Sequence, residues 1–145
     1  MKSLLHCLAL AACVWAGPLA QAAEEKTIPD ETKAAAVAWL GLLDQEQYAQ
    51  SWKDSSTRLK NILDEKMWVQ LMTKQRKPLG KSLSREFESA KFTRELPRQP
   101  EGEYWIVEFH SSFEGAKSTT ETVTVGKDKE GKWRVLAHRI RPAAA

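Results

Sequence analysis

Cysteine is scarce in this chain, and its scarcity excludes several kinds of site. The two cysteines, Cys7 and Cys13, both lie among the first twenty residues. The remainder of the chain therefore has no disulfide, no zinc–thiolate site and no cysteine nucleophile. The motifs of serine hydrolases, zinc proteases and phosphate-binding loops are also missing from the sequence. We accordingly expect no cofactor and no metal, and the sequence shows no plain catalytic constellation.

The chain also lacks a strong excess of either charge. It contains 22 Lys and Arg residues against 19 Asp and Glu residues. This balance predicts no strong preference for nucleic acid or for an anionic membrane. The densest basic cluster runs from Lys74 to Lys77, where a helix is expected to end. We interpret this cluster as compensation of the helix dipole.

The first 22 residues have the features of a secretory signal peptide. Lys2 supplies the positive start, residues 4–19 are mostly apolar, and Ala20-Gln21-Ala22 fits the rule of small residues at a cleavage site. The apolar run is interrupted by a Gly-Pro pair and is too short for a good membrane span. We expect cleavage after Ala22, which leaves a single domain over residues 23–145 in the periplasm or outside the cell.

Two weaker alternatives concern the same segment. Leu10-Ala11-Ala12-Cys13 resembles a bacterial lipobox, in which Cys13 would carry the lipid and anchor a lipoprotein. Only twelve residues precede Cys13, which is short for a complete leader. The other alternative is that the apolar run stays in the protein as an N-terminal anchor.

The first half of the mature chain has the apolar spacing of helices. One stripe recurs at positions i, i+3, i+4 and i+7: Ala36, Trp39, Leu40 and Leu43. Asp44 is expected to end this helix and to cap a second one, with Gln47 at the capping-box position. Tyr48 and Trp52 then share a face of that second helix. A third helix is expected to follow and to end at Pro78. The sequence leaves open whether this helix is broken near Asp64.

The second half contains four β-rich runs, at residues 82–96, 103–113, 117–125 and 132–140. In the first run Leu83, Arg85 and Phe87 share one parity, whereas Ala90 and Phe92 share the other. This switch predicts a β-bulge or sharp bend near residues 88–90. Helices followed by strands predict an α+β domain, with three N-terminal helices packed on a bent four-stranded antiparallel sheet.

The face of the sheet turned away from the helices is expected to be partly apolar. Uninterrupted alternation would place four apolar side chains there: Tyr104, Ile106, Leu136 and Ile140. A face of this kind is too apolar to be left wholly in water. We therefore predict a homodimer that forms through the sheet.

The order and spacing of several short motifs resemble a bacterial secreted family, domain of unknown function 4019. The motifs are Ala38-Trp39-Leu40, Tyr48, Ser51-Trp52, Trp68, Arg76-Lys77-Pro78-Leu79-Gly80, Ser84-Arg85 and Gly131-Lys132-Trp133-Arg134-Val135. The resemblance covers nearly all of the mature chain. It implies the cone-like fold of the nuclear-transport-factor-two-like, or cystatin-like, superfamily and a secreted location. The resemblance to the family implies no activity. The wider superfamily contains isomerases, dehydratases and non-catalytic binding modules, so the fold does not choose among them.

Two groups of titratable residues are candidate sites. Asp44 and Tyr48 could act as a carboxylate base and a phenolic donor, as in a small isomerase or dehydratase, although each has a structural explanation. His110 and His138 could hold a metal together with Glu108 if their strands lie side by side, but surface histidines are the simpler interpretation.

The aromatic residues of the helices favour binding over catalysis. Side chains from the helices could line a cone-shaped cavity, with one arginine of the sheet as the polar anchor: Trp39, Tyr48, Trp52, Trp68 and Arg85. Arg85 shares a face with apolar residues, so a partner carboxylate is needed, and Glu121 is the candidate. We therefore expect a non-catalytic module that binds a small apolar or anionic ligand, or another envelope protein.

Overall fold

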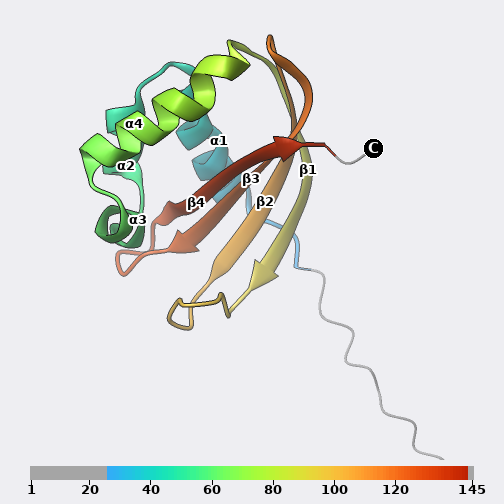
Figure 1. The fold of residues 1–145 in the computed structure, drawn as a ribbon. Helices are drawn as coiled ribbons and strands as arrows, with labels where there is room; N and C mark the ends of the chain where they lie inside the picture. The colour runs from blue at the N-terminus through green and yellow to red at the C-terminus, as the bar shows by residue number, and fades with distance from the viewer. Residues whose placement is uncertain (1–25, 144–145) are drawn as a thin grey trace, which may run out of the picture.

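A layer of helices covers one face of an antiparallel sheet in the computed structural model, which describes residues 26–143 (Figure 1). The sheet has four strands in the order β1-β2-β3-β4, so every strand pairs with its neighbours in the sequence. This arrangement confirms the predicted α+β class. The predicted cleavage after Ala22 and the lipobox alternative at Cys13 both concern residues outside the described range.

The helical layer contains one more helix than the three expected. Its elements are α1 (Asp30–Asp44), α2 (Tyr48–Asp54), α3 (Thr57–Ile62), α4 (Glu65–Arg76) and the short 3₁₀ turn η1 (Lys77–Leu79). The expected third helix is divided because Leu63 has an extended backbone and Asp64 caps α4. The carboxylate of Asp64 accepts a hydrogen bond from the backbone N–H of Met67 at 2.8 Å. The break near Asp64 is therefore the correct alternative.

The link between α1 and α2 corrects one prediction. Asp44 ends α1, but the residue that precedes α2 is Gln47, and its side chain makes no capping bond. Glu46 turns the chain between the two helices with a positive φ of 58°. The prediction that Asp44 caps the second helix is wrong, because its carboxylate points toward two arginines instead.

The strands of the sheet are β1 (Ser82–Thr93), β2 (Tyr104–Phe113), β3 (Ala116–Lys127) and β4 (Trp133–Pro142). In β1 the register shifts between Phe87, which pairs with Phe109, and Ser89, which pairs with Glu108. Glu88 is therefore the extra residue of a bulge, and the predicted bend near residues 88–90 is confirmed.

A second bulge, in β4, overturns the expected assignment of faces. Val125 pairs with Val135 and Thr124 with Ala137, so Leu136 is the extra residue. Because a one-residue insertion moves every later side chain to the other face, His138 and Ile140 turn toward the helices. The prediction that Ile140 shares the outer face with Tyr104 and Ile106 is wrong. The predicted grouping of His138 with the outer-face residues fails for the same reason.

Tryptophan side chains fill the space between the helices and the sheet. Trp39 is 4% exposed, and its indole N–H donates to the backbone oxygen of Ser51 at 2.8 Å. Trp68 packs on Trp39 with ring centroids 5.9 Å apart and donates to the hydroxyl of Ser51 at 2.9 Å. The buried polar groups of both indoles are thus satisfied, as close packing requires. Within residues 26–143, no helix has the length and apolarity needed to cross a membrane.

Candidate functional site

The aromatic residues predicted to line a cavity lie in three different settings. Trp39 and Trp68 are part of the packed core, where each contacts the other. Trp52 is half-buried, donates to the backbone oxygen of Leu63 at 2.7 Å and lies under the ammonium group of Lys60. Tyr48 borders a surface cavity. The structure therefore does not bring these four rings around one common cavity.

Arg85 forms the ion pair that its position in β1 predicted. Its Nε donates to Glu121 Oε2 at 2.6 Å, which confirms the predicted partner. Its Nη1 and Nη2 atoms donate to the two carboxylate oxygens of Asp44 at 2.7 and 3.0 Å. This fork-to-fork geometry is the strong form of an arginine–carboxylate pair. Burial alone would lower the pKa of Arg85, but the hydrogen bonds to Asp44 and Glu121 hold it above its usual value.

A second arginine completes the cluster. Arg76, at the end of α4, is 4% exposed and donates to Asp44 Oδ1 and, at 3.2 Å, to Glu121 Oε1. Its guanidinium also lies over the ring of Phe113, 4.8 Å from the centroid. Sequence reasoning missed this residue because a basic group in a last helical turn already has a local explanation. The signal was its place on the buried stripe of α4, four residues after Met72.

Glu121 lies at the centre of the cluster and is completely buried. Besides the two arginines, it accepts a hydrogen bond from the Ser111 hydroxyl at 2.6 Å and lies 3.3 Å from Nε2 of His138. Burial alone would raise the pKa of Glu121, but His138, Arg85 and Ser111 together lower it to about 2. We call Asp44, Arg76, Arg85 and Glu121 the mouth cluster; two guanidinium groups face two carboxylates, so their formal charges cancel.

The histidines do not form the candidate metal site. His138 faces the helices and packs against Trp39, with ring centroids 5.6 Å apart. His110 is exposed and pairs with Thr120 on β3. The two rings therefore lie on opposite faces of the sheet, which parity alone did not reveal because of the bulge at Leu136. Among residues 26–143, no three His, Cys, Asp or Glu side chains are close enough to hold a metal ion.

Asp44 and Tyr48 border the same surface cavity but are not arranged as a base and a donor. Both oxygens of Asp44 accept hydrogen bonds from guanidinium groups. Burial raises the pKa of Tyr48, and the nearby charge of Glu46 adds to this effect. The cavity has a volume of about 480 Å³ and is lined by Leu43, Asp44, Glu46, Tyr48, Thr73, Arg76, Lys77, Gly80 and Lys81.

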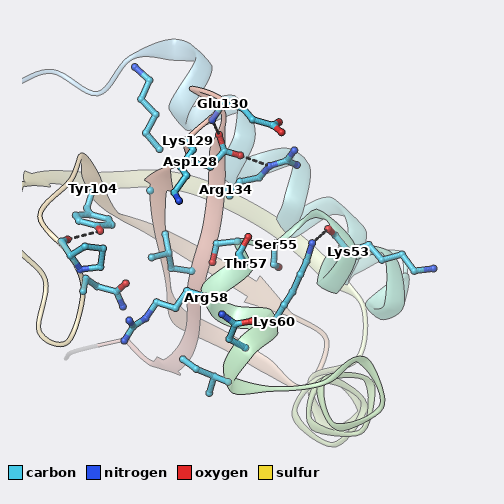
Figure 2. A pocket seen from close by; sticks show the side chains of 18 residues that line it. Lys53, Ser55, Thr57, Arg58, Lys60, Tyr104, Asp128, Lys129, Glu130 and Arg134 are labelled. Carbon is cyan, nitrogen blue, oxygen red and sulfur yellow. Dashed lines mark hydrogen bonds and ion pairs between the residues drawn. The ribbon is translucent and has the colours of Figure 1, made fainter.

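A larger groove of about 850 Å³ lies away from the mouth cluster (Figure 2). One wall is formed by the end of α2 and by α3, and the other by the turn between β3 and β4 with the loop before β2. The lining residues are Lys53, Ser55, Ser56, Thr57, Arg58, Lys60, Asn61, Ile62, Gln99, Pro100, Tyr104, Gly126, Lys127, Asp128, Lys129, Glu130, Arg134 and Leu136. We call this set the basic groove.

The basic groove carries six cationic side chains and only two anionic ones. Two of the cations are paired: Arg134 lies 3.3 Å from Asp128, and Lys127 lies 3.3 Å from Glu103. The other four make no ion pair within the described part of the chain: Lys53, Arg58, Lys60 and Lys129. Three of them come from α2 and α3 and one from the β3–β4 turn. In Figure 2 the Lys53 side chain extends away from the groove, and the Lys60 ammonium donates to the backbone oxygen of Lys53.

Sequence reasoning did not identify the basic groove. Its cations come from two stretches of chain about 70 residues apart, and each stretch also contains acidic residues. The local charge balance therefore looks ordinary along the sequence. The positive excess arises only where α3 approaches β4, an approach seen in the hydrogen bond from the backbone N–H of Ser56 to the oxygen of Val135 at 2.9 Å.

The fold defines a class of small α+β domain in which a helical layer covers one face of an antiparallel sheet. A family model described as protein of unknown function (DUF4019) matches residues 35–138, so the chain belongs to that family. The match extends from α1 into β4 and includes all residues of the mouth cluster and of the basic groove. No match was found among curated proteins.

Proposed function

We propose that this protein is an exported, non-catalytic module that binds an anionic ligand in the basic groove. The observation that carries the proposal is a set of four cations around one cavity that have no ion-pair partner among residues 26–143: Lys53, Arg58, Lys60 and Lys129. Like charges held together in a concave surface raise the local positive potential and attract anions. The mouth cluster has no such excess of positive charge, because its two arginines are paired with two carboxylates.

The size and chemistry of the basic groove fit a small molecule. A volume of about 850 Å³ lies within the usual range of ligand sites. Ile62 is 64% exposed on one wall, and Leu136 and Tyr104 contribute apolar surface on the other. A ligand with a negative group and an apolar body would use both kinds of surface. This chemistry sharpens the expectation of a small apolar or anionic ligand.

The lining residues favour binding over a reaction. Catalysis requires a nucleophile or base with a positioned partner. The Ser55 hydroxyl already accepts from the indole of Trp39 at 3.0 Å and donates to the backbone oxygen of Ser51 at 2.7 Å. No histidine among the described residues lines the groove, and the carboxylate of Asp128 is held by the backbone N–H groups of Glu130 and Lys132. These contacts support a recognition role.

Export forms part of the proposal and rests on the leader that ends at Ala22. Placement in the nuclear-transport-factor-two-like superfamily is likewise proposed, on the order of helices and the bent sheet. Intact mass of the protein recovered from the periplasm tests export directly. A mass that begins at Ala23 is expected, whereas a mass with diacylglycerol on Cys13 would establish the lipoprotein alternative.

Binding can be tested with 8-anilinonaphthalene-1-sulfonate, a probe that combines a sulfonate with aromatic rings. We expect saturable binding that weakens as salt is added, because screening reduces the attraction between exposed charges. The double variant Arg58→Glu/Lys60→Glu should weaken the affinity by about tenfold or more, which corresponds to about 1.4 kcal/mol. The measurement is a fluorescence titration at constant pH.

The matched control is Lys91→Glu/Lys117→Glu, which makes the same charge change at two exposed lysines outside the groove. It should leave the affinity within about twofold of the parent, since only long-range charge is altered. Equal weakening in both double variants would show attraction by net charge alone and would refute a groove-specific site. If the natural ligand is an acidic segment of an envelope protein, an acidic peptide should displace the bound 8-anilinonaphthalene-1-sulfonate from the groove.

A further inference from the structure

Asp44 occupies a position that local helix chemistry disfavours. It is the last residue of α1, where the helix dipole is negative, and no basic residue lies in that last turn. Its carboxylate is nevertheless held by Arg76 and Arg85. Asp44 is 23% exposed, whereas Glu121 is sealed from solvent. The mouth cluster therefore has a closed inner side and an open outer side.

Glu121 fixes the two guanidinium groups from the inner side. It receives Nη1 of Arg76 and Nε of Arg85, which leaves other N–H groups of both arginines directed at Asp44. Two guanidinium groups that converge on one carboxylate form a preorganised carboxylate site. An arginine has five N–H groups, and the two together make five hydrogen bonds to side chains of the described residues.

Solvent reaches the carboxylate of Asp44 from two directions. It lines the cavity of about 480 Å³ together with Arg76, and a second cavity of about 500 Å³ together with Arg85. Lys81 borders both cavities, and Lys77 borders the first. Neither lysine has an ion-pair partner among residues 26–143. Glu46 also borders the first cavity, so outside the cluster two cations face one anion there and the approach keeps a positive excess.

We infer that Arg76 and Arg85 form a second ligand site, separate from the basic groove, which takes the carboxylate of a small organic acid. The chain's own Asp44 occupies this site in the structure, and the incoming acid exchanges with it. The exchange replaces one carboxylate with another, so the cluster stays neutral and no buried charge is left unpaired. Release of Asp44 to solvent also relieves its unfavourable interaction with the helix dipole.

The inference can be tested by chemical rescue of Asp44→Ala with acetate. The truncation removes the occupant and leaves two arginines with a single carboxylate partner. We expect acetate to raise the Tm of this variant by about 3 °C or more above the value in chloride at equal ionic strength. Acetamide, which has the same shape without the charge, should have no such effect. Glu46→Ala is the matched control, since Glu46 lines the same cavity but makes no bond to either arginine.

Absence of rescue in Asp44→Ala, or equal rescue in Glu46→Ala, would overturn the site. If Asp44→Ala does not fold, acetate titration of the unmodified protein decides the question through the NMR shift of Arg85 Nε. A saturable shift supports exchange, and a flat response refutes it. The same shift in Arg58→Glu/Lys60→Glu would show that the result is independent of the basic groove.

Discussion

The mouth cluster and the basic groove use the same cationic residue types but treat their charge in opposite ways. In the mouth cluster, Arg76 and Arg85 face Asp44 and Glu121, and the formal charges sum to zero in a mostly buried setting. In the basic groove, six cations meet two anions at the surface. The comparison shows that partners and burial, rather than the number of arginines and lysines, decide what a basic cluster can do.

The two regions should therefore respond differently to substitution. Burial removes a charged group from water, and only an oppositely charged partner offsets that free-energy cost. Loss of the partner therefore destabilises the fold. An exposed cation is solvated whether or not it is paired, so its removal changes stability little. Substitution of the sealed Glu121 in the mouth cluster should act mainly on folding, and substitutions in the basic groove mainly on binding.

The largest effect is expected for Glu121→Gln. This change keeps the shape of the side chain but leaves Arg76 and Arg85 with Asp44 as their only charged partner within residues 26–143. We expect a loss of roughly 3–5 kcal/mol in the free energy of unfolding, measured by urea denaturation. Glu108→Gln is the matched control, because Glu108 lies on the outer face with the exposed Arg141 at 3.3 Å. Similar losses in the two variants would contradict the distinction.

Acid should reveal the same cluster through its pH dependence. The folded pKa of Glu121 is about 2, below its ordinary value of 4.5. Because folding lowers this pKa, the ionised carboxylate stabilises the fold at pH values above 4.5. This contribution to stability is lost as the pH falls from 4.5 through 2. The loss should approach roughly 3 kcal/mol from this group. Thermal unfolding across this window should be much flatter for Glu121→Gln, and parallel curves for both proteins would refute the assignment.

Much of the fold could be predicted from the sequence because its signals are local. The apolar stripe of α1 and the parity switch in β1 each require only a few neighbouring residues. The bulge at Leu136 could not be predicted, because Val135, Leu136 and Ala137 are all apolar and no polar residue marks a change of face. That one missed residue placed His138 and Ile140 on the wrong side of the sheet.

The candidate sites show the same limit more strongly. The pairing of Arg85 with Glu121 could be predicted, because a charged residue on the apolar side of a strand needs a partner of opposite charge. Asp44 and Arg76 could not, because a helix cap and a basic last turn explain them without any distant contact. The basic groove depends on α3 lying beside β4, which is a tertiary fact. Charges from separate segments acquire a common role only through such packing.

A much smaller effect on stability is expected in the basic groove. Arg58→Gln/Lys60→Gln removes two cations that have no ion-pair partner among residues 26–143. Both side chains are half-buried, and Lys60 also donates to the backbone oxygen of Lys53 and lies over the Trp52 ring. The free energy of unfolding should fall by no more than about 1 kcal/mol, because neither cation has an ion pair to lose. Chemical denaturation measures this value, with Lys91→Gln/Lys117→Gln as the control. A loss comparable to that of Glu121→Gln would show that the groove cations are structural.

The smallest effect on the fold concerns association through the outer face of the sheet. Ile106 remains on that face and is half-buried, but it has threonine and charged side chains nearby, and Ile140 does not add to it. A homodimer through this face stays a prediction. Ile106→Lys should shift the protein toward monomer in sedimentation experiments without altering its Tm by more than about 2 °C. A monomer at high micromolar concentration in the parent protein would exclude the dimer.

The central claim is that an anionic ligand binds in the basic groove, and residue-by-residue NMR tests it most directly. The unmodified protein is titrated with 8-anilinonaphthalene-1-sulfonate while backbone amide shifts are followed. Saturable shifts are predicted at residues 53–62 and 126–136, with the amide of Glu121 unchanged. Shifts confined to outer-face residues away from the groove, such as Ile106 and Glu108, or spread evenly over exposed lysines such as Lys91 and Lys117, would contradict the claim.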